Sequence, residues 1–333
     1  MTKDADAWTC LWERSQRSPF LHGAAVRAYA ERAVPTPALA LHGSPRPTVG
    51  ILLEERNAGL VTPLPLPDPL VLDRATGDPE AVLEVVQRTC HDHDVSEMWF
   101  PLVDANSRSA KVLAITPGVA RWARTPSPTV DWSDRGDSLW RRVCERHGSQ
   151  AVRKRNRFEK EMRVVDLASD RVDEAVAAIK QIEARSWKHQ HGLLLLSGQL
   201  EYFAELVSHG QAFVAVALKG ELPVAYRFDA LHNETVYTVR WSYDDAFRRY
   251  APGFYLLTKG LVQRWQNTSL DRIHLLGYPD TLKELIQDGS EPRWDFFWPD
   301  GDRATQLRDE AVAFDRRRAE QYLSGVGLRH FFK

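Results

Sequence analysis

The chain has 333 residues, of which 43% are hydrophobic and 27% are charged. This composition excludes a disordered or fibrous protein, and because a domain usually holds about 100–150 residues, it predicts two folded domains. The 44 basic and 45 acidic side chains give a formal net charge of −1, which taken alone disfavours nucleic-acid binding.

The N-terminal half carries faint signs of a mixed α/β domain. Helical periodicity predicts helices at His22–Ala33 and Pro79–His91. The order of its elements resembles that of the second half, so a diverged duplication is one interpretation. Strands are predicted at Ala38–Leu41, Thr48–Leu53 and Glu97–Leu102, and the four prolines of Val61–Leu70 predict an irregular surface segment.

A Pro-, Ser- and Asp-rich stretch, Thr125–Asp137, lies near the middle of the chain. Its turn-forming residues show neither helical nor strand periodicity, which is typical of a linker. We therefore expect one domain over residues 1–125, a linker over 126–149 and a second domain over 150–333.

The segment Arg141–Arg163, which we call the basic belt, has nine basic and three acidic residues and a net charge of +6. The rest of the chain must then sum to −7. The near-zero total is a cancellation, so it does not argue against nucleic-acid binding. The belt fits either a phosphate-contacting surface or a solvated basic helix paired with acids elsewhere.

The second half predicts a layered mixed α/β domain without the strict alternation of a doubly wound fold. Short turns at Lys219-Gly220 and His232-Asn233 join three alternating runs into an antiparallel meander. Helices are predicted at Asp170–His189, Ser197–Ser208, Pro252–Gln266 and Pro279–Gln287, and strands at Gln211–Leu218, Leu222–Leu231, Thr235–Tyr243, Arg272–Leu276 and Trp294–Trp298.

The cysteines and the apolar runs indicate the cellular compartment of the protein. Cys10, Cys90 and Cys144 form no CxxC pair or even disulfide framework, which favours a reducing compartment. The N-terminus is polar and acidic, unlike a signal peptide, and the densest aliphatic run, Leu193–Leu196, is too short to span a membrane. We expect a cytoplasmic protein that does not contact membranes, and its Arg- and Ala-rich usage suggests a GC-rich bacterial genome.

Five stretches occur in a characteristic order: Val152–Glu161, Glu183–His189 with its Ser-Trp-Lys, Leu222–Ala225, Tyr243–Leu257 with its Pro-Gly, and Leu276–Lys283. Over about residues 150–300, they resemble the GNAT (N-acetyltransferase) superfamily, and within it the tandem group of CelD-like acyltransferases and Fem-type peptidyl transferases. Ser18–Phe20 resembles the start of the degenerate N-terminal domain of such proteins. The resemblance implies an α/β fold of two GNAT-like mixed-sheet domains in tandem, the N-terminal one degenerate.

The expected donor loop departs from this family. GNAT enzymes that use coenzyme A carry a Gly-rich loop whose N–H groups hold the pyrophosphate, but here Arg248–Gly253 keeps a single glycine. Pro252 also removes one N–H donor. Leu275 and Leu282 stand where the family has Asp and Tyr. If the donor site is kept, Arg248, Arg249 and Gly253 would contact the donor.

Charged and aromatic residues of the predicted meander are the first candidates for the reaction. Arg227 and Asp229 lie on one face of their strand, and Arg240 lies opposite Trp241 and Tyr243 on the next. Because unpaired charges inside a sheet are costly, these residues form either a polar floor beneath the acyl-transfer cleft or a structural ion pair. We assign Asp229 and Arg240 as catalytic candidates and Arg227, Trp241 and Tyr243 as substrate contacts.

Four further residues follow from the resemblance. Tyr278 stands where GNAT enzymes often keep a leaving-group acid, although an aromatic there can simply pack. Trp187 and Lys188 would cover the acceptor site or contact the donor, and the alternative is a core Trp beside a solvated Lys. Lys283 is either a substrate contact or an exposed helical lysine.

The sequence predicts no metal site and no bound cofactor. The pairs His91/His93 and His189/His191 lack a third ligand, and no phosphate-loop or dinucleotide motif occurs. We expect aminoacyl-tRNA or acyl-CoA as co-substrate, with tRNA contacts from Arg153, Lys154, Arg155 and Arg157.

Three functions remain open from the sequence. The first is an amide-forming transferase that moves an aminoacyl group from aminoacyl-tRNA to an amine of a small molecule or peptide. The second is an acyl-CoA-dependent N-acyltransferase, and the third is a non-catalytic GNAT-like RNA-binding module. The acceptor and the oligomeric state stay undetermined.

Overall fold

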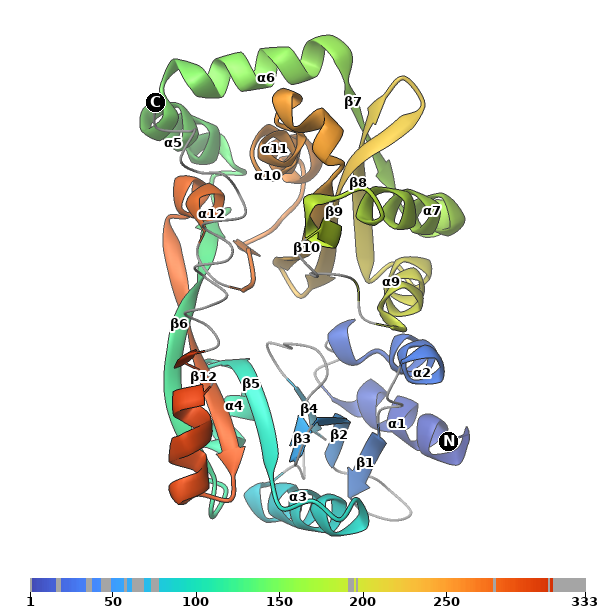
Figure 1. Ribbon diagram of the computed structural model, residues 1–333, viewed down its shortest axis with the longest axis vertical. Coiled ribbons are helices and arrows are strands. Elements are labelled where there is room, and N and C mark those ends of the chain that lie inside the picture. The colour runs from blue at the N-terminus through green and yellow to red at the C-terminus, as the bar shows by residue number, and fades with distance from the viewer. Residues whose placement is uncertain are drawn as a thin grey trace. The chain divides into compact units, whose positions relative to one another are not determined.

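The chain forms two compact units (Figure 1). Unit 1 comprises Met1–Pro126 together with Glu291–Lys333, and unit 2 comprises Ser127–Ser290. The structure, a computed structural model, describes residues 2–15, 19–33, 38–42, 49–56, 59–61, 69–72, 78–190, 195, 197–277, 280–310 and 312–313. Most of the predicted proline-rich segment at 61–70 lies outside these residues.

Unit 1 is a mixed sheet with helices, as expected, and its strand order is β1-β2-β3-β5-β12. β1 and β2 pair antiparallel, whereas β3 and β5 pair parallel across the helix α3. Asp78 caps α3 by accepting a hydrogen bond from the Ala81 N–H, and Pro79 occupies its first turn. The elements are α1 (Thr2–Arg14), α2 (Gly23–Arg32), β1 (Ala38–His42), β2 (Val49–Arg56), β3 (Gly59–Val61), β4 (Leu70–Leu72), α3 (Pro79–Asp92), β5 (Met98–Asp104), α4 (Arg108–Leu113) and β12 (Gly289–Trp298).

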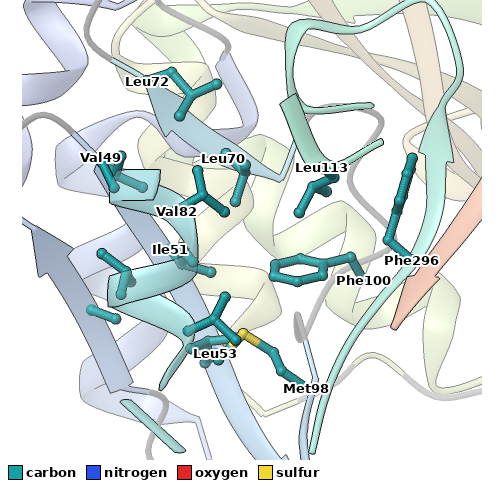
Figure 2. Packing of buried hydrophobic residues seen from close by; sticks show 14 of the residues in the cluster. Val49, Ile51, Leu53, Leu70, Leu72, Val82, Met98, Phe100, Leu113 and Phe296 are labelled. Atoms are coloured by element: carbon teal, nitrogen blue, oxygen red, sulfur yellow. The ribbon is translucent and has the colours of Figure 1, made fainter. Parts of the chain in front are cut away.

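The core of unit 1 depends on its last strand, β12. Figure 2 shows Phe296 of β12 beside Phe100 and Leu113 in the same buried cluster. Asp295, also on β12, is fully buried and accepts hydrogen bonds from Arg124, from the Trp99 indole at 3.0 Å and from the Leu102 N–H at 2.8 Å. A buried carboxylate with this many donors is well compensated.

Unit 2 contains a sheet of order β6-β11-β10-β9-β8-β7. β8, β9 and β10 form the predicted antiparallel meander, and β11 pairs parallel to β10. α7 and α9 lie on one face of this meander and α10 and α11 on the other (Figure 1). The elements are β6 (Ala120–Asp131), α5 (Asp137–His147), α6 (Ser149–Glu161), β7 (Arg163–Leu167), α7 (Val172–Glu183), α8 (Trp187–Gln190), α9 (Gln199–Ser208), β8 (Ala212–Lys219), β9 (Leu222–His232), β10 (Thr235–Tyr243), α10 (Pro252–Leu257), α11 (Lys259–Trp265), β11 (Arg272–His274) and α12 (Thr281–Ile286).

A common order of elements recurs in the two units: helices, antiparallel strands, a helical segment, a parallel strand and a further helix. In unit 2, α5, α6 and β7 precede this order. In each unit an antiparallel strand completes the pairing beside the parallel one. β6, from the N-terminal half, pairs with β11 in unit 2, and β12, from the C-terminal half, pairs with β5 in unit 1. The chain therefore holds two mixed-sheet domains in tandem that exchange their closing strands.

The predicted linker over 126–149 is wrong. Residues 120–131 form the strand β6, and α5 follows it. Pro126 and Pro128 are tolerated because pairing with β11 begins only at Thr129, opposite His274, so neither proline interrupts that ladder. The predicted second domain at 150–333 also differs, because β6 from Ser127 onward and α5 belong to unit 2, whereas β12 from Glu291 onward belongs to unit 1.

Candidate functional site

β10 and β11 stop pairing in the middle of the unit 2 sheet. Their parallel pairing covers three residue pairs and ends at Tyr237 opposite His274. β10 then continues to Tyr243 with an extra residue, Val239, whereas β11 ends. Leu276 and Gly277 adopt positive φ angles of 43° and 63°. We call Thr238–Tyr243 and Leu275–Gly277 the strand fork.

The extra residue decides which way Arg240 points. In a regular strand Thr238 and Arg240 would share a face, but the bulge turns Arg240 to the other face. Arg240 therefore faces α7, whereas Asp229 lies with Thr238 on the face of α10 and α11. The two predicted catalytic residues are thus not brought together, and the polar floor expected from both does not form.

Arg240 is held by a carboxylate that the sequence analysis did not single out as a site residue. Its Nε and Nη2 donate to the two carboxylate oxygens of Glu183 at 2.9 and 2.8 Å, and the Tyr226 hydroxyl donates to the same carboxylate. Burial raises the pKa of Glu183, but the hydrogen bonds and charge of Arg240 outweigh it, so that pKa is lowered overall. Burial, and then the charge of Glu183, raises the pKa of Tyr226, so its hydroxyl keeps its proton.

Two lysines bind the two arms of the strand fork. Lys188, on α8, donates to the carbonyl of Trp241 in β10, and its Nζ lies 5.5 Å from the centroid of the Trp241 ring. Lys283, on α12, donates to the carbonyl of Leu276 at 2.6 Å. The capping carboxylate Asp280 begins α12 and lies 3.9 Å from the Lys283 Nζ.

Lys188 is placed by a break after α7. The predicted helix to His189 is interrupted at Ala184–Ser186, where Ser186 forms a β-bridge with Asp244 and Arg185 makes an ion pair with Asp244 at 3.1 Å. This connection turns α8 so that Lys188 is only 6% exposed. The alternative of a solvated lysine is therefore wrong.

The environment of Lys188 disfavours its charge. Burial, followed by the charge of Arg240, lowers the pKa of Lys188 to about 7; Lys283 adds to the shift, and Glu183 and Asp280 oppose it. A sizeable fraction of the Lys188 side chains is then uncharged at neutral pH.

Arg227 and Asp229 form a buried network on the other face. Arg227 donates to Asp229 at 2.8 Å, and Thr238 and Trp265 donate to the same carboxylate at 3.0 and 3.2 Å. Arg227 and Asp229 are 0% and 2% exposed. With three donors the carboxylate is satisfied, which favours the structural ion pair over a catalytic role.

The same arginine breaks a predicted helix. The Arg227 guanidinium donates to the carbonyl of Leu256, and Thr258 leaves helical geometry with φ −121° and ψ −96°. A side chain inserted into the helical hydrogen-bond ladder is an established cause of such a break. The expected helix Pro252–Gln266 is consequently two helices, α10 and α11.

The predicted donor residues are occupied by internal contacts. Arg248 lies 3.3 Å from Asp245, and a hydrogen bond with Tyr243 raises its pKa. Arg249 donates to the Tyr250 hydroxyl at 2.7 Å. A Cβ on Gly253 would lie 2.7 Å from the Trp241 ring, which itself stacks with Tyr243. Close packing on Trp241 thus accounts for the glycine without a bound pyrophosphate.

The four predicted tRNA contacts on α6 differ in their surroundings. Arg153 is exposed and, within the described part of the chain, makes no ion pair or hydrogen bond. Lys154 is half-buried, 2.8 Å from His147 and 4.9 Å from the Phe254 ring, and burial lowers its pKa to about 8. Arg155 lies over Trp140, and Arg157 donates to the Arg249 carbonyl at 2.8 Å.

Other predicted residues lie partly or wholly outside the described set. Tyr278 is one of them, and of Trp187 only the backbone, in α8, is described. His274 was missed, although a histidine between Ile273 and Leu275 in an apolar strand is a detectable sign. Its ring stacks on Tyr237 with centroids 5.5 Å apart, and its Nδ1 accepts from the Leu276 N–H at 3.1 Å.

The described residues contain no cluster of three or more His, Cys, Asp or Glu side chains able to hold a metal ion. In the same residues, no helix has both the length and the apolar character needed to cross a membrane.

A family model described as an acetyltransferase (GNAT) domain matches residues 120–284. This segment of the chain is a GNAT domain. The match begins at β6 and ends in α12, so it includes the strand and helix that we expected to be a linker. The curated proteins contain no significant match to the chain.

Solved structures share the fold over most of the chain. The C-terminal domain of a putative lysylphosphatidylglycerol synthetase from Agrobacterium fabrum superposes with a TM-score of 0.64 at 13% identity, covering 93% of this chain and 96% of that one. L-PGS from Bacillus licheniformis gives 0.58 at 12% identity with coverages of 93% and 96%. FemX gives 0.51 at 10% identity with coverages of 85% and 92%.

Proposed function

We propose that the protein is an amide-forming aminoacyl transferase, which moves an aminoacyl group from aminoacyl-tRNA to an amine of a small molecule or peptide. The GNAT domain supports acyl transfer as the reaction class. The observation that carries the choice of donor is the altered loop at Arg248–Gly253. Its exposed arginines contact neighbours within the loop, its glycine packs on Trp241, and Pro252 lacks an N–H, which weakens the usual cradle for the pyrophosphate of coenzyme A.

The strand fork supplies the chemistry that such a transfer needs. An ester carbonyl gains negative charge as the amine attacks, and donors and charges fixed beforehand at that position lower the barrier. Lys283 is held on the Leu276 carbonyl, so its positive charge has a fixed place at one arm of the fork. Most of the remaining rate enhancement would come from positioning the amine and the ester together.

The basic belt supports a nucleic-acid donor through its exposed members. Arg153 and Lys160 are exposed on α6, and Arg141 is exposed on α5. The similar structure from A. fabrum belongs to a putative lysylphosphatidylglycerol synthetase, which also favours an aminoacyl cargo over an acetyl one.

The donor is tested by offering two labelled pools to the purified protein: bulk tRNA charged with ¹⁴C-amino acids, and ¹⁴C-acetyl-CoA. Each reaction contains the same set of dipeptides and amino sugars as acceptors. We expect an amide product by mass spectrometry from the tRNA pool, abolished when that pool is treated with RNase. Turnover with acetyl-CoA alone, or turnover that survives RNase, would contradict the proposal in favour of an acyl-CoA enzyme. RNA binding with no turnover from either pool would favour the binding module.

The tRNA surface is tested by the salt dependence of binding. Replacing Arg153 and Lys160 with alanine should reduce the slope of log K against log salt by roughly 0.7–0.9 for each phosphate that the protein no longer neutralises. Lys154→Met is the matched control, because this lysine is half-buried against His147 and Phe254. An unchanged slope in the double variant would exclude these two residues from binding phosphate.

A further inference from the structure

We infer that the side-chain amine of Lys188 is the proton acceptor of the transfer reaction, taking the proton that the acceptor's ammonium must lose before it attacks the acyl carbonyl. The inference rests on the proposed transfer from aminoacyl-tRNA. It gives Lys188 a role that differs from the substrate contact expected from the sequence.

The position of Lys188 is the first support. Its Nζ binds the Trp241 carbonyl on β10 at the strand fork, beyond the last parallel residue pair of β10 and β11. The side chain is 6% exposed and therefore largely, but not fully, shielded from water.

The other described titratable groups nearby are already committed. Glu183 is held by Arg240 and Tyr226, and Asp229 is held by three donors on the opposite face. Asp280 accepts hydrogen bonds from the Leu282 and Lys283 N–H groups at the start of α12. His274 directs its Nδ1 to the Leu276 N–H.

Charges on three elements surround the amine. Arg240 on β10 and Lys283 on α12 disfavour the ammonium form, whereas Glu183 on α7 and Asp280 at the start of α12 favour it. These opposing charges, together with burial, bring the pKa of Lys188 to about 7. A base of this strength is largely uncharged just above neutral pH, yet it can hold a proton during turnover.

The proton balance is as follows. The acceptor ammonium gives one proton to Lys188 and becomes an amine. The amine nitrogen forms a bond to the acyl carbon, and the bond from that carbon to the ribose oxygen breaks. The second amine proton passes to the ribose oxygen, which leaves as a hydroxyl. Lys188 then returns its proton to water.

The kinetic test uses Lys188→Met and Lys188→Arg, with Lys180→Met as control because Lys180 is an exposed lysine on α7. We expect the wild-type rate to rise with pH through about 7, as Lys188 loses its proton. Both Lys188 variants should lose this rise and about 10²-fold or more in kcat, since arginine keeps the charge but cannot accept the proton. A rise with pH that persists in Lys188→Met, or that disappears instead in His274→Gln, would overturn the inference.

A second readout does not depend on activity. In protein labelled with ¹³C-lysine, the Lys188 Cε resonance is the one that is missing from the spectrum of Lys188→Met. It should titrate near pH 7, and Lys283→Met should move that midpoint to higher pH because one neighbouring cation is removed. A midpoint near 10 would overturn the inference even if the protein transfers acyl groups. A midpoint near 7 without transfer from either donor would instead show that the proposed function fails.

Discussion

At the scale of single residues, Lys188 lowers the stability of the fold. The pKa of Lys188 falls from 10.5 to about 7 in the folded protein, so between these pH values the unfolded chain binds more protons than the folded one. Stability therefore rises with pH through this window, and the cost of burying the ammonium is fully present below about pH 7.

Lys188→Met should consequently stabilise the protein at pH 6 by on the order of a few kcal/mol, because methionine fills the site without a charge. The gain should shrink steadily as the pH rises from about 7 to 10.5. Urea unfolding at several pH values measures both quantities. A gain that does not vary with pH would mean that packing, and not charge burial, is responsible.

Of the residues in this region, Asp229 is the one whose replacement should lower the free energy of unfolding most. Asp229→Asn removes the negative charge that compensates the fully buried Arg227, and it points an NH₂ group at one of three donors. Breaking a buried pair in this way costs about 3 kcal/mol. The variant should unfold at lower urea concentration with an unchanged slope, whereas Glu221→Gln, at the exposed Arg163–Glu221 pair, should change little. Equal effects in the two variants would refute the buried network.

At the scale of elements, the short helix α12 depends on α5. Arg146 donates through one nitrogen to the carbonyls of Glu284, Leu285 and Gln287, and Arg142 donates to the Ile286 carbonyl at 3.2 Å. These guanidinium groups satisfy the last carbonyls of α12 and place positive charge at the negative end of its dipole, which is favourable. Part of the basic belt is therefore structural, and it holds the helix that carries Lys283.

Arg146→Met should cost about 1 kcal/mol and increase hydrogen exchange in α12, because three carbonyls lose their donor. Hydrogen–deuterium exchange of peptides from Thr281–Ile286 measures the effect. Arg153→Met, at an exposed arginine on α6, is the control and should leave that exchange unchanged. Equal exchange in both variants would exclude capping as the role of Arg146.

At the scale of the whole molecule, each half of the chain supplies a strand to the sheet of the other half, so each half needs the other to complete its fold. Val130 of β6, Trp132 just after it, and Leu139 and Val143 of α5 belong to the buried core of unit 2. A fragment that begins at residue 150 lacks all four. Such a fragment cannot bury the faces of α11 and β11 that these residues cover.

We therefore expect the fragment 150–333 to unfold without a cooperative transition and to give a poorly dispersed NMR spectrum. The shorter fragment 120–290 contains β6 and α5 and should unfold cooperatively. Circular dichroism during thermal unfolding distinguishes the two. A cooperative transition in 150–333 would show that the strand exchange is dispensable.

Much of the second half was predictable from local pattern. The three meander strands and their turns were predicted to within a residue or two, because alternation and turn residues act over a few positions. The pairing of Arg227 with Asp229 also followed from the two-residue period of a strand. The antiparallel meander and the GNAT resemblance were thus confirmed.

The residues of the strand fork were only partly predictable. Lys188 and Lys283 were singled out, but the burial of Lys188 depends on the bridge between Ser186 and Asp244, which are far apart in sequence. The separation of Arg240 from Asp229 depends on one bulged residue, Val239, and alternation cannot reveal it. The sequence indicates only that Arg240, if buried, needs an acidic partner; it does not identify that partner as Glu183.

The sequence by itself determined the mixed α/β class, the meander and the uneven distribution of charge, since these depend on neighbours along the chain, and its family resemblance implied the tandem arrangement. Only the tertiary structure decided where the domains begin and end, which basic residues stay exposed, and which lysine loses its charge. Those outcomes depend on strands and side chains from distant positions that exclude water from one another. Burial of this kind lowers the pKa of Lys188. Pairing with β11 likewise makes the proline-rich segment a strand, β6.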